Sequence, residues 1–146
     1  MISGLVAFLA LPATAVATCG LPQPRLACQE YFAESAVVVA KLVRVRKVEP
    51  LRPGRTEGAY YYMETVERVK GKILNRFQIY EENVTGRAPF AWKRGENYLL
   101  FLSYSKDDRG WELDGCGNSS PIAKAQRVLR EIGAIKAGKG RETILG

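Results

Sequence analysis

The sequence contains no histidine and only three cysteines among its 146 residues, and both shortages restrict its chemistry. Without histidine, there is no Ser-His-Asp or Cys-His catalytic centre and no His-ligated zinc. Acidic residues are also in the minority, since 15 Asp and Glu stand against 22 Lys and Arg, for a formal net charge of +7. We therefore expect a binding protein rather than an enzyme, with neither a cofactor nor a metal site.

The rest of the composition is that of an ordinary globular protein. Hydrophobic residues make up 47% of the chain and charged residues 25%. These fractions argue against disordered and fibrous classes. The length fits one domain that is large enough to bury a hydrophobic core.

The N-terminal segment has the pattern of an export signal. Residues Met1–Ala17 carry no charged side chain and include an apolar run from Leu5 to Leu11. Ala15-Val16-Ala17 matches the cleavage pattern of secretory signal peptides, which leaves Thr18 as the first mature residue. The alternative is an N-terminal strand or helix buried in the fold. We expect export, to the periplasm or the extracellular space.

The same segment is too short to span a membrane, because Pro12 interrupts the apolar run well before the ~20 residues that a spanning helix needs. A lipoprotein anchored through Cys19 is not favoured, because Thr18 precedes it where a smaller residue is expected.

Export favours an oxidising compartment. Three cysteines then predict one disulfide and one free thiol.

Apolar and β-branched residues in short runs, with turn residues between them, predict five strands. The expected strands cover residues 36–48, 59–69, 77–80, 98–104 and 111–115, after a helical turn at 29–35. Ser120 as N-cap and Pro121 at the first helical position predict a helix that ends at Gly133. Residues 134–146 are expected to form a flexible basic tail.

This order predicts a mainly β fold: a small five-stranded OB-like antiparallel barrel with a short N-terminal helical turn and a C-terminal amphipathic helix. The domain is expected to span residues 18–133. A β-sandwich is the alternative that the pattern leaves open.

Several segments in this order resemble one family. They are the apolar strand Val37–Val43, Glu67-Arg68-Val69-Lys70-Gly71, Gly95-Glu96-Asn97-Tyr98-Leu99-Leu100-Phe101, Cys116 and Ala125-Gln126-Arg127. Together they are similar to the netrin-like domain, in particular to bacterial exported proteins that resemble tissue inhibitors of metalloproteinases. The resemblance implies an OB-like barrel, export and a protein-binding role without catalysis.

The resemblance also implies a disulfide at Cys116, which would fasten the last barrel strand to the N-terminal segment. Its partner is Cys28, which we prefer, or Cys19. The inhibitors of that family begin with Cys-x-Cys, whereas here Gly20 and Leu21 follow Cys19. The motif that binds the protease zinc is therefore absent.

The expected partner surface combines the N-terminal arm with an aromatic loop. Its residues are Cys19, Gly20, Leu21, Phe90 and Trp92. The alternative is that Phe90 and Trp92 plug one end of the barrel. We expect a monomer that binds an exported or cell-surface protein, a metalloprotease included, and no nucleic acid.

A different function is also open. A pI near 9.5 and seven tyrosines favour a basic aromatic face on the barrel. OB-type barrels use such faces for charged polymers. The alternative function is thus an envelope-associated binder of anionic polymers or glycans.

Overall fold

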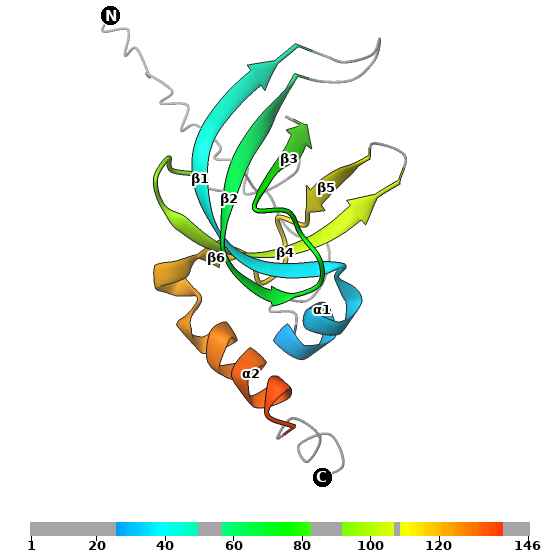
Figure 1. Cartoon of the computed structure of the whole chain (residues 1–146), viewed down its shortest axis with the longest axis vertical. Helices are drawn as coiled ribbons and strands as arrows, with labels where there is room; N and C mark the ends of the chain where they lie inside the picture. The colour runs from blue at the N-terminus through cyan, green and yellow to red at the C-terminus, as the bar shows by residue number, and fades with distance from the viewer. Residues whose placement is uncertain (1–25, 50–56, 83–91, 107–108, 139–146) are drawn as a thin grey trace, which may run out of the picture.

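The computed structural model describes residues 26–49, 57–82, 92–106 and 109–138. Within these ranges it contains two α-helices, one short 3₁₀ helix and six strands (Figure 1). They are α1 (Ala27–Ala33), β1 (Ala36–Val48), β2 (Gly58–Lys70), β3 (Arg76–Glu82), β4 (Asn97–Ser105), β5 (Gly110–Leu113), β6 (Ser120–Pro121), η1 (Ile122–Lys124) and α2 (Gln126–Lys136). No described helix is long and apolar enough to cross a membrane.

Five of the strands close into a barrel. Neighbouring strands are hydrogen-bonded in the order β1-β2-β3-β5-β4, and β4 pairs with β1 to complete the ring. At the closure, Val37 lies opposite Phe101 and Val39 opposite Leu99. The short strand β6 pairs with β4 as well. The predicted mainly β, OB-like barrel with a helix at each end of the domain is confirmed.

One pairing corrects the prediction of an all-antiparallel barrel. Strands β3 and β5 run parallel, with Ile79 opposite Trp111. The reason is geometric, because strand directions cannot alternate all the way round a closed ring of five. One neighbouring pair must run in the same direction, and here the short contact between β3 and β5 takes that place.

Strand β1 pairs with two neighbours, β2 and β4. It pairs with β2 along its length, from Val37 opposite Lys70 to Val48 opposite Gly58. It pairs with β4 only over Ala36–Lys41. Beyond an irregularity in register after Leu42, β1 continues along residues 58–62 of β2 as a hairpin arm, which rises above the barrel in Figure 1. On its other side, this part of β2 pairs with β3.

The first half of β1 is buried on both faces, as its sequence predicts, because it separates two hydrophobic clusters. Its even-numbered residues face the barrel interior and its odd-numbered ones face the helices. The interior contains Ala36, Val38, Ala40, Leu42, Met63, Ile73, Phe77, Ile79, Tyr98, Leu100, Leu102 and Leu113. The second cluster contains Ala27, Val37, Val39, Leu99, Phe101, Ala125, Val128 and Ile132.

The two helices contact each other and cover the outer face of β1 and β4, at the lower end of Figure 1. The C-terminal helix begins later than predicted, because Ser120 and Pro121 pair with β4 instead of capping it. An extended Pro121 is compatible with a strand end as well as with a helix start. The helix also continues three residues past the predicted end, since Gly133 lies within it.

The connection after β2 shows why glycine stands at position 71. Gly71 has φ +80°, and a Cβ added there would lie 2.3 Å from the carbonyl oxygen of Ser35. Its neighbour Lys70 donates from Nζ to the carbonyl oxygens of Tyr31 at 2.5 Å and Glu34 at 2.7 Å. A cation thus satisfies the carbonyl groups at the end of α1, where the helix dipole favours it.

Candidate functional site

The described residues form an open groove of about 600 Å³. Its walls come from all five barrel strands and from the turn before β3. They are Val43, Tyr62, Met63, Glu64, Leu74, Arg76, Phe77, Gln78, Tyr104, Arg109, Gly110 and Trp111. Most of them belong to β2, β3 and β5, whereas the helices cover β1 and β4. Its volume lies within the range of known ligand pockets, about 300–1,000 Å³.

The groove exposes apolar and aromatic side chains. Leu74 is 73% exposed, Tyr104 48% and Val43 42%. Tyr104 and Trp111 lie opposite each other on β4 and β5, and their rings meet edge to face with centroids 5.2 Å apart. The pairing of the two strands therefore fixes two aromatic rings side by side at one end of the groove.

Charged groups surround these rings. Arg76 lies opposite Glu64 on the neighbouring strand, with 4.0 Å between Nη2 and Oε1. Both side chains are largely exposed, so this pair contributes little to stability. Arg109 also lines the groove, and Arg44 places its guanidinium 4.1 Å from the ring centroid of Tyr62. Basic side chains therefore outnumber acidic ones around the groove.

The basic and aromatic pattern continues along the outer face of the hairpin arm. Arg46 lies 5.4 Å above the ring of Tyr60, and that ring is 5.0 Å from the ring of Tyr80. Because Arg44 and Arg46 are two residues apart on one strand, they share a face. Together with the groove they form the aromatic-basic face, defined here as the groove residues plus Arg44, Arg46, Tyr60 and Tyr80.

Trp92, which was predicted either to plug the barrel or to form an exposed ridge, packs against the barrel core. Its ring stacks on Tyr61 with centroids 4.7 Å apart and lies 4.9 Å from the ring of Tyr98. Its indole Nε1 donates to Glu81 Oε2 at 2.9 Å. Trp92 thus closes the barrel and does not stand on a ridge. Phe90 and the N-terminal residues 19–21 lie outside the described residues.

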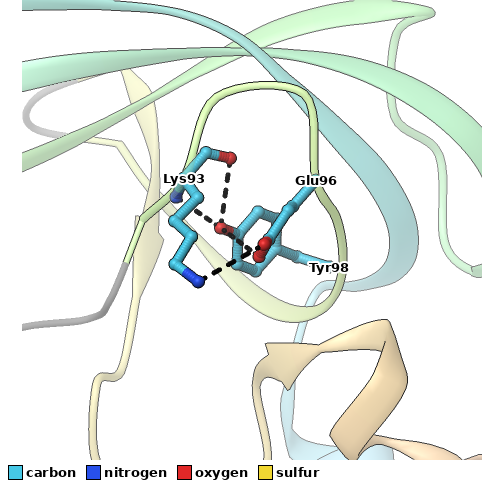
Figure 2. A network of polar contacts seen from close by, with 3 residues as sticks. All are labelled: Lys93, Glu96 and Tyr98. Carbon is cyan, nitrogen blue, oxygen red and sulfur yellow. Dashed lines mark hydrogen bonds and ion pairs between the residues drawn. The ribbon is translucent and has the colours of Figure 1, made fainter.

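A polar network fixes the chain between Trp92 and β4 (Figure 2). The hydroxyl of Tyr98 accepts a hydrogen bond from the Lys93 backbone N–H at 2.6 Å. The same hydroxyl lies 3.4 Å from Glu96 Oε2, and Lys93 Nζ lies 3.6 Å from Glu96 Oε1. Burial above all raises the pKa of Tyr98, and the Glu96 carboxylate adds to the rise. The Tyr98 hydroxyl therefore stays protonated, which suits a structural role in this network.

The cysteines correct one prediction. Cys28 is a free thiol, so the preferred pairing of Cys28 with Cys116 is wrong. Cys116 is disulfide-bonded, and its partner is not among the described residues; Cys19, the alternative half, also lies outside them. The reason lies in α1: Glu30 faces the turn at Cys116, and Cys28, two residues earlier on the helix, points elsewhere.

Sequence reasoning missed the buried carboxyl group of Glu30. The residue is 4% exposed, and Oε2 accepts hydrogen bonds from the backbone N–H and from Nδ2 of Asn118, each at 2.7 Å. Oε1 has no hydrogen-bond partner. Gly117 leaves the space that this group occupies, since an added Cβ would lie 1.9 Å from Oε1. The contact joins α1 to the turn after β5.

Sequence reasoning also missed the groove, because its residues are ordinary one by one and meet only when five strands close. The described residues contain no group of three or more His, Cys, Asp or Glu side chains that would hold a metal ion. The arrangement offers aromatic faces and guanidinium groups in one open cleft. Aromatic faces and guanidinium groups are suited to binding a ligand by ring contacts and by charge-assisted hydrogen bonds. No protein-family model matches this chain, and a search of curated proteins also finds no match.

Proposed function

We propose that the protein is a non-enzymatic binding module that holds an acidic glycan on its aromatic-basic face. The observation that carries the proposal is the groove, in which the exposed Tyr104, the half-buried Trp111 and two arginines line one cavity. Of the two functions expected from the sequence, this one uses residues that the structure describes.

The chemistry of the face fits sugars with negative charges. Pyranose rings have apolar C–H surfaces that pack on aromatic rings, and Tyr104, Trp111 and Tyr62 provide such rings. Guanidinium groups bind carboxylates and sulfates through charge-assisted hydrogen bonds, and Arg76 and Arg109 lie in the same cleft. The formal net charge of +7 attracts such ligands from a distance.

Export is part of the same proposal. The uncharged segment 1–17 with its Ala-x-Ala pattern supports a secretory signal, and the disulfide at Cys116 supports an oxidising compartment. Acidic polysaccharides of cell envelopes are found in these places. The protein is therefore proposed to work in the periplasm or outside the cell.

The test is a titration of the protein with an oligosaccharide of galacturonic acid, followed by calorimetry and by tryptophan fluorescence. Tyr104→Ala should weaken binding roughly fivefold, the equivalent of about 1 kcal/mol of ring contact. Phe32→Ala is the matched control, because Phe32 is an aromatic residue, 69% exposed, on α1 and away from the groove. Added salt should weaken binding to the wild type.

Two outcomes would overturn the proposal. One is that the wild-type protein does not bind acidic oligosaccharides even at millimolar concentration. The other is that Tyr104→Ala and Phe32→Ala weaken binding equally, since ring contacts in the groove would then play no part.

A second candidate function, inhibition of a metalloprotease, has one observation in its favour. Cys116 is disulfide-bonded, and the resemblance to netrin-like inhibitors implies a disulfide at this position. The processed protein should then inhibit a zinc protease. One residue added before the mature N-terminus should abolish inhibition, whereas one added at the C-terminus should not. Full activity of the protease with the processed protein would refute this candidate.

A further inference from the structure

Arg109 has an unusual backbone for its residue type. Its φ is +48°, in the left-handed region, and it is the single non-glycine residue with positive φ in the described part of the chain. The other described positions in this region are Gly71, Gly95 and Gly138. Side chains with a Cβ disfavour this conformation, whereas glycine adopts it freely. An arginine here is thus not explained by the needs of the backbone.

The guanidinium of Arg109 also has no partner among the residues that the structure describes. The hydrogen bonds and ion pairs of the described residues include none from its side chain, although the residue is exposed and lines the groove. By contrast, Arg76 pairs with Glu64, and Arg44 stacks on Tyr62. Among the three arginines near the groove, Arg109 alone has neither an ion pair nor a ring contact with a described residue, and its five N–H donors can serve a ligand.

The surroundings place this donor group beside the aromatic rings. Arg109 comes two residues before Trp111, and Trp111 lies against Tyr104. A sugar ring packed on these two aromatic residues would hold its substituents close to the Arg109 guanidinium. A planar carboxylate is the group that a guanidinium binds best, through two parallel hydrogen bonds.

We propose that Arg109 is the residue that makes the groove specific for acidic sugars, by binding a carboxylate of the glycan. The inference rests on the proposed function and adds which residue recognises the charge. A strained backbone at a binding residue is a known association, since the strain persists where the side chain is needed for function.

The experiment compares two ligands that differ only at the carboxyl group, a galacturonic acid oligosaccharide and its methyl ester. Wild type should bind the acid about tenfold more tightly than the ester, as expected for one charge-assisted contact. Arg109→Gly should bind both ligands equally, at the wild-type affinity for the ester. Its melting temperature should equal or exceed that of the wild type, because glycine accepts the positive φ. Arg109→Lys should keep part of the preference.

Arg130→Gln is the control, because Arg130 is exposed on α2, outside the groove, and its loss lowers the net charge by the same amount. This variant should keep the full preference for the acid. The inference on Arg109 is overturned if Arg109→Gly keeps the preference, if Arg130→Gln loses as much, or if wild type binds acid and ester equally. In that last case the groove still binds glycans and the proposed function stands. Wild type that binds neither ligand would overturn both.

Discussion

Replacement of Gly117 by alanine tests the contact between α1 and the turn after β5. The added Cβ would lie 1.9 Å from Glu30 Oε1 and 2.8 Å from Glu30 Cδ, far inside van der Waals contact. The φ of Gly117 is not in the left-handed region, so the backbone itself accepts alanine. The whole cost must come from displacing the carboxyl group of Glu30.

That carboxyl group has little room to move, because Glu30 is 4% exposed and Oε2 accepts two hydrogen bonds from Asn118. Displacement breaks both bonds, each worth about 1 kcal/mol, and leaves buried polar atoms unpaired. We expect Gly117→Ala to lower the free energy of unfolding by about 2–4 kcal/mol. Urea denaturation followed by far-UV circular dichroism measures this change.

Gly133→Ala is the matched control, since it is the same substitution with the opposite expected sign. No atom lies within 4 Å of an added Cβ at Gly133, which is within α2. Alanine should stabilise the helix there by about 0.5–1 kcal/mol. In a Glu30→Ala background, Gly117→Ala should cost much less than in the wild type. An equal cost in both backgrounds, or a cost below about 0.5 kcal/mol in the wild type, would refute the reasoning.

Three further predictions concern other parts of the barrel. Burial first, and then the Glu81 carboxylate, raise the pKa of Tyr61. The contribution of Tyr61 to folding stability is therefore fully present below pH ~10 and is lost as the pH rises through the folded-state pKa. Tyr61→Phe should therefore flatten the decline of stability measured by urea unfolding at alkaline pH, and an unchanged decline would contradict this. Lys70→Met should lower stability by about 1–3 kcal/mol, because carbonyl groups at the end of α1 lose their donor, and a melting temperature equal to that of wild type would count against the contact. Iodoacetamide should label Cys28 in the unfolded, unreduced protein and should label Cys116 only after reduction. Mass spectrometry of the peptides measures the labelling, and labelling of Cys116 before reduction would contradict this prediction.

The strands were predictable from the sequence because each is apolar or alternating over its own length. The predicted strand at residues 36–48 matches β1 at both ends, since Val37, Val38 and Val39 are buried on both faces. The parallel pair was predictable in principle from the odd number of strands. The helix start was not, because Pro121 suits a strand end and a helix start equally well.

The candidate site was not predictable, for a physical reason. Tyr62 and Arg76 are far in sequence from Tyr104 and Arg109, and the two pairs come together only through barrel closure. Exposed apolar residues such as Leu74 look like ordinary surface positions until their neighbours are known. The positive φ of Arg109 also has no signature in composition or periodicity. Only the aromatic and basic character of the face was visible in the sequence.

The partial pairing of β1 has a consequence for self-association. Leu42 still exchanges backbone hydrogen bonds with Gly95 and Glu96, but past it β1 pairs with no described strand on the side away from β2. Such an open edge invites a second copy to add its own strand. Arg44 and Arg46, both exposed, would then meet the arginines of that copy at close range. The like charges, to which the proposed function assigns an acidic ligand, would thus also discourage aggregation, and neutral residues at both positions would remove this protection.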